Sequence, residues 1–396
     1  MRRHLLGLGF AAASSLLALN AAQAMTGPQA INIDGGPLGQ LSLSGGVNGY
    51  GYVVSNQPNN LQTTGANIGD ALIELQKNTG VLQFTIEVGS TSSQTLGALG
   101  SDRKGHIPNT STNVFTTGPL YAGYITIAPQ NSPVTVSVGQ LASLEGYESL
   151  QAWNNPSQLT TALFYVENSQ SRGVSASYAN GPLSATVEFG DGVDSGVFNF
   201  LQALVSYQFN ANNTLSVYYA GNLGRTGLNT YAYGGYTTGT FGNTVAAGAA
   251  YANNQMVGAY YSYTNGSLNL IPEVQYQLAK ADHQIGIQKP TSTFGAAVLA
   301  DYAFANTPYS LGGWVEYFNS HTSAADNASW FVGPDASAIG AALSPTWQYK
   351  DLYVRANAGY IYLLHHRDAL GNEFGYGNTG TSRGQFTGTL EAGLLF

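Results

Sequence analysis

The C-terminal end of the chain alternates between apolar and largely polar positions. The apolar positions are Phe386, Gly388, Leu390, Ala392, Leu394 and Phe396, and the residues at 385, 387, 389 and 391 between them are polar. Successive side chains of a β-strand point to opposite faces, so this period of two predicts a strand with one apolar and one polar face. A strand between lipid and water needs such a pattern, and the last strand of a soluble sandwich can also show it.

Segments with the same period recur along the chain. We predict strands near residues 41–54, 67–77, 81–88, 119–128, 133–139, 171–179, 183–190, 196–209, 214–223, 250–264, 267–279, 293–304, 309–319, 338–349, 352–364 and 384–396. This interpretation gives about sixteen strands, an even number that keeps both termini on one side of a barrel. The stretch 242–256 is interpreted as a loop leading into one strand, although a turn at Asn253-Asn254 would favour about eighteen strands.

The predicted strands are joined alternately by short turns and by longer polar loops. The turns are Asn78-Thr79-Gly80, Pro129 to Ser132, Asn180-Gly181-Pro182, Asn210 to Asn213, Asn265-Gly266, Asn306 to Pro308 and Lys350-Asp351. Asn-Gly pairs favour tight hairpins because both residues tolerate positive φ. Tight turns at one end and long loops at the other are typical of outer-membrane barrels.

The N-terminus has the three parts of a secretory signal peptide. Arg2 and Arg3 are followed by an apolar stretch from Leu5 to Leu19 and by Ala22-Gln23-Ala24, which resembles a cleavage site. The apolar stretch is shorter than the roughly 20 residues that a membrane anchor needs. We therefore expect residues 1–24 to be removed and residues 25–396 to form one barrel domain.

The composition favours a membrane barrel over a soluble fold. Charged residues make up 9% of the chain, which also has 50 Gly, 26 Tyr and no Cys, whereas soluble domains carry roughly 25% charged residues. Beyond the predicted leader, no apolar stretch approaches the roughly 18 residues of a helical span, so any spanning part must be a closed barrel. We expect an all-β, antiparallel transmembrane barrel in the bacterial outer membrane.

Strand number carries the functional prediction. A barrel of about sixteen strands encloses an aqueous channel, whereas side chains fill a barrel of about eight. The sequence therefore predicts a porin for small hydrophilic solutes and ions, surrounded by outer-membrane lipid. Phe396 and Leu394 resemble the C-terminal signal that the outer-membrane assembly machinery recognises.

The alternation also predicts which residues face the channel. The inward charged residues named by this pattern are Glu74, Glu87, Glu188, Glu273, Glu316 and Glu391, with Arg355 as the one base. Such a wall should attract cations, unless its charges merely keep the lumen wet and Arg355 pairs with a neighbouring carboxylate. Pro272 falls on the lipid face, where it removes a ladder donor and should mark a bulge.

Residues 140–170 are too long and too mixed in composition for a simple outer loop. We consider this segment a candidate constriction that folds into the barrel, in which case Glu145 and Glu148 would narrow and acidify the pore. The alternative is an ordinary surface loop with one helical turn.

Other functions have weaker support in the residues. We expect no enzyme, no cofactor and no nucleic-acid partner, because the chain has neither a nucleophile elbow nor a phosphate-binding loop. His365-His366 lies beside Asp368, but adjacent strand residues point to opposite faces, so we expect no metal site. The alternatives are a structural or adhesive barrel with Tyr-rich outer loops such as 224–242, or a substrate-selective channel.

Two segments resemble the OmpL-like β-barrel porin family. The first is residues 168–192, with Arg172-Gly173-Val174, Tyr178, Gly181-Pro182 and Asp191-Gly192; the second is the predicted hairpin at 293–318. The resemblance implies an outer-membrane porin that could form a homotrimer, and it supplies no catalytic residues. The low charge content departs from general porins, whose constrictions usually set an Arg cluster against acids.

Overall fold

A computed structural model describes residues 25–57, 61–91, 94–98, 120–167, 171–192, 197–226 and 245–396. Its barrel strands are β2 (Gln40–Val54), β3 (Thr64–Lys77), β4 (Leu82–Ser90), β6 (Leu120–Ile127), β7 (Val134–Leu141), β9 (Ser171–Asn180), β10 (Leu183–Gly190), β11 (Phe200–Asn210), β12 (Asn213–Asn222), β13 (Asn254–Asn265), β14 (Leu268–Ala279), β15 (Thr291–Ala303), β16 (Tyr309–His321), β19 (Ser337–Tyr349), β20 (Leu352–His365) and β21 (Gly384–Leu395). The predicted signal peptide lies outside the described residues.

The shorter elements lie at the two ends of the barrel or inside it. They are β1 (Ile31–Asp34), η2 (Gly36–Leu38), β5 (Gln94–Thr95), η3 (Ala152–Asn154), β8 (Leu159–Thr160), α1 (Ala162–Val166), α2 (Val245–Ala252), η4 (His283–Ile285), β17 (Ser329–Phe331) and β18 (Gly333–Pro334). Within the described ranges, no helix is long and apolar enough to span a membrane.

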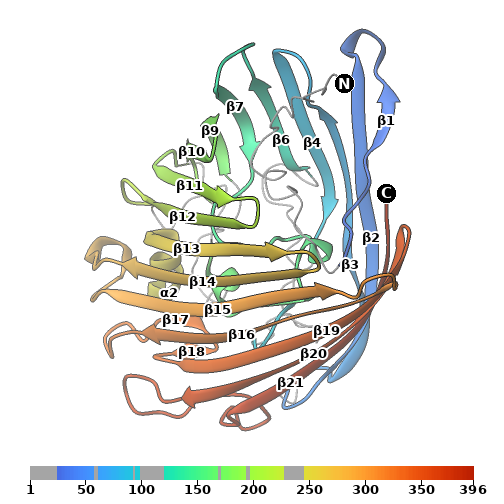
Figure 1. Cartoon of the computed structure of the whole chain (residues 1–396). Helices are drawn as coiled ribbons and strands as arrows, with labels where there is room; N and C mark the ends of the chain where they lie inside the picture. The colour runs from blue at the N-terminus through green and yellow to red at the C-terminus, as the bar shows by residue number, and fades with distance from the viewer. Residues whose placement is uncertain are drawn as a thin grey trace.

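The strands form one antiparallel sheet that closes on itself (Figure 1). Seventeen strands belong to this sheet, and β1 pairs only with one end of β2, so the remaining sixteen make the barrel wall. Closure occurs between β2 and β21, from Gly46 opposite Leu395 to Val54 opposite Thr387. The prediction of a sixteen-strand antiparallel barrel is confirmed.

The stretch before β13 is where an extra hairpin was considered. Residues 245–252 form α2, and Asn253 and Asn254 connect this helix to β13 instead of turning between two strands. The strand therefore begins at Asn254, four residues later than predicted from the apolar pattern. The described residues leave no place here for an additional pair of strands.

The predicted turns lie between consecutive strands at one end of the barrel. Gly181 and Gly266 take the positive φ values of 58° and 60° that two-residue hairpin turns require. The hairpin of β1 and β2 lies at this same end, where Asp34 pairs with Gln40. Because β1 and β21 lie end to end along β2, the start of β1 and the end of β21 are neighbours at the edge that closes the barrel.

The prediction of a bulge at Pro272 is wrong. Along β13 and β14, Tyr260 pairs with Glu273 and Tyr263 pairs with Leu270, so the register is the same on both sides of the proline. On its other side, Pro272 pairs with Val298 in an unbroken register. The missing N–H interrupts the ladder locally but does not insert a residue.

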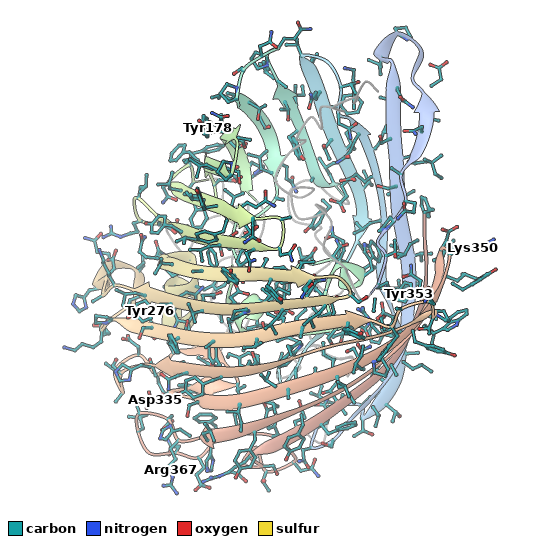
Figure 2. All side chains as sticks on the ribbon, in the orientation of Figure 1. Tyr178, Tyr276, Asp335, Lys350, Tyr353 and Arg367 are labelled. Atoms are coloured by element: carbon teal, nitrogen blue, oxygen red, sulfur yellow. The ribbon has the colours of Figure 1, made fainter. Side chains whose placement is uncertain are left out.

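The side chains alternate across the wall as a barrel between lipid and water requires. On β14, Leu270, Val274 and Tyr276 are exposed on the outer face, while the polar residues between them are buried on the inner face. Figure 2 labels Tyr276, which lies on the outer face of the wall, and Tyr353, which is buried on the inner face of β20. The inner face of β14 to β21 is buried almost without interruption, so other segments of the chain must cover it from inside the barrel.

Candidate channel and its inner loop

The segment between β7 and β9 lies inside the barrel, where Figure 1 shows its green trace against the inner wall. It includes η3, β8 and α1, and its backbone contacts strands on several sides. The backbone N–H of Leu144 donates to Gln202 of β11, and that of Gln158 donates to Asn357 of β20. The structure thus places Glu145 and Glu148 within the lumen, as part of this inner loop (residues 142–167).

One docking point centres on Arg355 of β20. Its guanidinium donates to the carbonyl oxygens of Asn155 and Ala152 at 3.0 and 2.9 Å, and it forms a 2.8 Å ion pair with Glu391 of β21. Tyr353 Oη also donates to Glu391, at 2.5 Å. Arg355 and Glu391 are both buried, so they position the inner loop instead of facing an open lumen.

A second docking group is Asp70 of β3, which sequence reasoning missed. Its carboxylate accepts from the N–H of Ala152 at 2.9 Å and from Asn48 at 3.2 Å. In the β2–β3 ladder, Val47 pairs with Ala71 but Gly49 pairs with Ile68, so two residues of β3 oppose Asn48. The bulge shifts the phase of β3 on its N-terminal side, where Ile68 is outward, and leaves Asp70 on the inner face in phase with Glu74.

Strands β14 and β16 hold the helical part of the loop. Glu316 of β16 accepts from the N–H of Ala162 at 2.7 Å, at the start of α1. Trp314 Nε1 donates to the carbonyl of Leu159 at 2.6 Å, and Gln277 donates to that of Val166 at 2.6 Å. Polar wall side chains therefore satisfy backbone groups that the irregular loop cannot pair internally.

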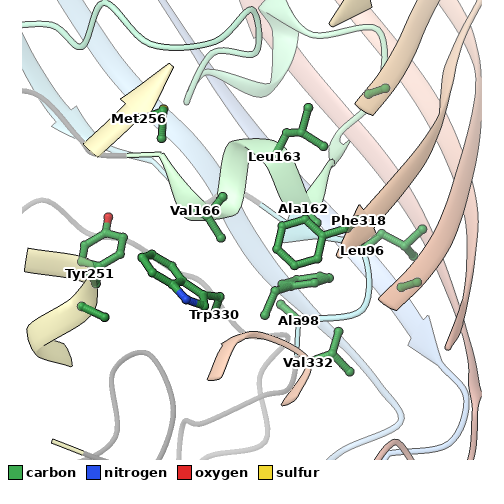
Figure 3. Close-up of a cluster of buried hydrophobic side chains, with 14 of the residues drawn as sticks. Leu96, Ala98, Ala162, Leu163, Val166, Tyr251, Met256, Phe318, Trp330 and Val332 are labelled. Atoms are coloured by element: carbon green, nitrogen blue, oxygen red, sulfur yellow. The ribbon is translucent and has the colours of Figure 1, made fainter. Parts of the chain in front are cut away.

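Apolar side chains fill the space between α1 and the wall. Figure 3 shows Leu163 and Val166 of α1 close to Phe318 of β16 and Trp330 of β17, all of them in one buried cluster. Trp330 Nε1 donates to Thr291 Oγ1 at 2.8 Å, which satisfies its polar atom within this cluster. The inner loop is consequently a packed body, and its helical part packs against side chains of β16 and β17.

Acidic groups gather where this body meets β14. Glu148 accepts from both the N–H and the hydroxyl of Thr161, and Glu273 accepts from Tyr218 Oη at 2.9 Å. Burial raises the pKa of Glu148 from 4.5 to about 8. Burial, followed by the negative charges of Glu273, Glu145 and Glu148, raises the pKa of Glu167 as well. Sequence reasoning missed Glu167, which follows α1 directly.

The remaining predicted wall acids lie away from α1. Glu74 and Glu87 are direct cross-strand neighbours on β3 and β4 and are half-buried. Glu74 accepts from Ser44 at 3.3 Å, and Glu87 accepts from Gln151 of the inner loop at 2.8 Å. Glu188 is buried on β10, opposite Gln202 of β11 and Ser175 of β9.

Hydroxyl groups line the wall between β6 and β12. Three pairs of them are hydrogen-bonded across neighbouring strands: Thr126 with Ser137, Ser177 with Thr186 and Ser206 with Ser216. Ser177 and Ser206 are half-buried, whereas the inner faces of β15 and β16 are almost wholly buried. The other four hydroxyl residues of these pairs are buried, so of the six only Ser177 and Ser206 are partly accessible. Over the described residues, no group of acids and histidines is arranged to hold a metal ion.

A closed sixteen-strand barrel with tight turns at one end and an inner loop defines a porin-type outer-membrane channel protein. The family model "Putative beta-barrel porin-2, OmpL-like" matches residues 40–396, so the chain belongs to this family of porins. The family suggested by the two sequence segments is confirmed, and its model covers the whole described barrel.

Solved porins share this fold at low sequence identity. An anion-selective porin from Comamonas acidovorans is 11% identical with a TM-score of 0.57, covering 90% of this chain and 99% of that one. OmpT of Vibrio cholerae in its trimer form is 10% identical with a TM-score of 0.54, covering 90% and 99%. The channel DcaP of Acinetobacter baumannii is 10% identical with a TM-score of 0.53, covering 90% and 97%. No curated protein sequence matches this chain.

Proposed function

We propose that this protein is a cation-preferring diffusion channel of the bacterial outer membrane, in which the inner loop forms the constriction. The observation that carries the charge preference is the imbalance inside the described part of the barrel. Arg355 is the one basic side chain that we find on the inner wall or inner loop there, and Glu391 already neutralises it. The acids placed there are Asp70, Glu74, Glu87, Glu145, Glu148, Glu167, Glu188, Glu273, Asp301, Glu316 and Glu391.

Glu74 and Glu87 are the acids best placed to act on passing ions. They are half-buried and adjacent, whereas Glu148, Glu273 and Glu316 are almost fully buried against the inner loop. A charged ring beside the ion path sets selectivity in many pores, and carboxylates favour cations. This assignment gives the predicted selectivity residues two different roles: Glu74 and Glu87 act on ions, while Arg355, Glu316 and Glu391 position the loop.

Reversal potential across a planar bilayer tests the charge preference. With a tenfold KCl gradient at pH 7.5, we expect a potential of the sign that marks K⁺ as the more permeant ion. The preference should weaken when total salt is raised, because the Debye length falls from about 10 Å at 0.1 M to about 3 Å at 1 M. A zero or anion-selective potential would contradict it.

A substrate-selective channel is the second candidate, and the apolar packing around α1 favours it. The cluster containing Leu163, Phe318 and Trp330 anchors a large body inside the barrel, which leaves less of the lumen for unselective diffusion. The two candidates differ in saturation. Block of the ion current by one solute at low concentration would favour the substrate-selective channel, and a current indifferent to all small sugars and amino acids would favour general diffusion.

We also propose that the barrel forms a homotrimer in outer-membrane lipid. Among the exposed large apolar side chains of the described strands, those from β1 to β9 are all Ile, Leu or Val, and the aromatic ones begin at Phe189 of β10. Tyr and Trp normally surround a barrel where it meets the lipid headgroups. The arc from β2 to β9 therefore suits contact with neighbouring copies, and one solved relative of this fold is a trimer form.

Single cysteines test this interface, because the chain has no Cys of its own. Ile125→Cys lies on the aliphatic arc and Val274→Cys on the aromatic side, and both positions are exposed. A short bifunctional thiol reagent should join protomers through position 125 but not through position 274. Equal crosslinking at both positions, or at neither, would count against the trimer.

For assembly, we propose that Phe396 and Leu394 are the recognition signal. Phe396 closes the barrel, since its carbonyl accepts from the N–H of Gly45 at 2.7 Å, and Leu394 is exposed on the outer face. Phe396→Ser should lower the amount of folded barrel in the outer membrane, while a purified chain refolded in detergent should be unaffected. Normal assembly of the variant in cells would contradict this role.

A further inference from the structure

Five carboxyl groups from three parts of the fold surround α1. Glu145, Glu148 and Glu167 belong to the inner loop, Glu273 belongs to β14 and Glu316 to β16, and all five are at least nine-tenths buried. Glu148 and Glu316 hold adjacent backbone groups, because they accept from the N–H groups of Thr161 and Ala162. Glu316 Oε1 has no hydrogen-bond partner. These two carboxyls therefore hold adjacent residues at the start of α1, one from the inner loop and one from β16.

Within the described residues, no base acts on Glu148, Glu167 or Glu316. The charged and titratable groups acting on Glu148, Glu167 and Glu316 are other members of the set. The further titratable groups facing the set are tyrosines and one acid: Tyr147 of the loop, Tyr218 of β12, Tyr260 of β13, Asp301 of β15 and Tyr376 of the segment before β21. Tyr251 of α2 also donates to the carbonyl of Glu167 at 2.8 Å. Ionisation of several carboxyls at once would place like charges in a poorly solvated space.

We propose that the carboxyls around α1 form a pH-sensitive latch, which holds the inner loop against the wall when they are neutral and releases it as they ionise. The inference rests on the proposed channel, since its readout is conductance. The released loop frees the lumen that α1 occupies, so the channel conducts more at high pH.

The sign follows from proton linkage. Docking raises the pKa of Glu148 from 4.5 to about 8, so the docked loop binds more protons than a released one. Docking is consequently strongest below the ordinary carboxyl pKa and weakens as the pH rises through this window. Above about pH 8, the destabilising effect of Glu148 is complete and no longer changes with pH.

Single-channel conductance between pH 4.5 and pH 9, at high salt to suppress surface charge, tests the latch. We expect a rise on the order of twofold for the native protein, as the population shifts from docked to released loop. The combined variant Glu148→Gln, Glu167→Gln, Glu273→Gln cannot ionise at these positions and should stay at the low conductance throughout. Glu373→Gln is the matched control, because it removes an exposed carboxyl, paired with Arg367, that has no bond to the inner loop in the described contacts, and it should keep the rise.

A disulfide separates loop movement from simple loss of charge. The Leu163 side chain of α1 lies 2.7 Å, at Cγ, from where a Cβ on Gly295 of β15 would stand, so Leu163→Cys with Gly295→Cys places two thiols within bonding reach. The oxidised pair should lose the pH-dependent rise, and reduction should restore it. A rise that persists after oxidation, or in the combined Gln variant, would overturn the latch, as would constant conductance of the native protein. Absence of any conductance steps would instead overturn the proposed channel.

Discussion

Arg355 and Glu391 lie directly opposite each other on β20 and β21, and their 2.8 Å ion pair is almost completely buried. The same guanidinium also donates N–H groups to two carbonyl oxygens of the inner loop. The ion pair thus links the last two strands of the wall to the segment that lies inside it. Removing Arg355 leaves the buried Glu391 charge without its ion-pair partner and the loop carbonyls without their donors.

Arg355→Ala should lower the free energy of unfolding by about 3–5 kcal/mol, the usual cost of breaking a buried ion pair. Urea unfolding of the refolded protein in lipid vesicles, followed by tryptophan fluorescence, measures this change. Arg367→Ala is the control, because the Arg367–Glu373 pair is solvent-exposed and should contribute less than about 1 kcal/mol. Equal losses in both variants would contradict the positioning role of Arg355.

Gly312→Ala should loosen the inner loop. A Cβ on Gly312 of β16 would lie 1.9 Å from the carbonyl oxygen of Pro156, a backbone atom that cannot rotate away. The added methyl group should displace the backbone of the inner loop. We therefore expect greater noise in the open-channel current and a lower midpoint of urea unfolding. Gly51→Ala, whose Cβ would meet only ordinary contact at 3.7 Å, should behave like the native protein. Indistinguishable current traces for the two variants would exclude this packing.

Removing the Glu74–Glu87 pair should reduce cation preference. In Glu74→Gln combined with Glu87→Gln, we expect the reversal potential in a KCl gradient to move toward zero, because two half-buried carboxylates beside the ion path are lost. Glu373→Gln, in a surface ion pair near the long loops, is the control and should leave the potential unchanged. An unaltered potential in the double variant would assign selectivity to other residues.

Arginine on the outer face of β14 should be costly only at mid-depth. Val274→Arg is expected to destabilise the barrel by about 2–4 kcal/mol, and Leu268→Arg at the strand end by about 0–1 kcal/mol. Both side chains belong to the outer face, so the difference reports depth in lipid. Unfolding from vesicles measures both values, and similar costs at the two positions would be inconsistent with a membrane-spanning β14.

The wall was predictable from sequence because one physical constraint governs it. Each strand separates lipid from a polar interior, so alternation at Leu270, Val274 and Tyr276 fixes both the strand and its inner face. The turns were predictable for the same local reason, since Gly181 and Gly266 permit positive φ. Alternation fails within β3, where the bulge opposite Asn48 shifts the phase, so the outward Ile68 and Ile73 are an odd number of residues apart. Asp70 keeps the inward phase of Glu74, so alternation counted back from Glu74 would have found it.

The inner loop was predictable in place but not in contacts. Its length and mixed composition made it a candidate for a segment inside the barrel, with a surface loop as the alternative. Which wall residues bind it depends on pairs far apart in the chain, such as Glu316 with Ala162 and Arg355 with Asn155. For this reason Arg355, Glu316 and Glu391 are predicted from the sequence to be selectivity residues. Their hydrogen bonds and ion pair instead support a role in positioning the inner loop. Pro272 shows the converse, because a rule about ladder donors predicted a bulge that the unbroken register of its neighbours prevents.

Swelling of liposomes containing the purified protein, in isotonic solutions of sugars of graded size, tests the central claim most directly. A water-filled channel narrowed by an inner loop predicts fast swelling with small sugars, falling steeply as solute size increases. Vesicles that swell with none of the sugars, despite correctly folded protein, would contradict an open diffusion channel.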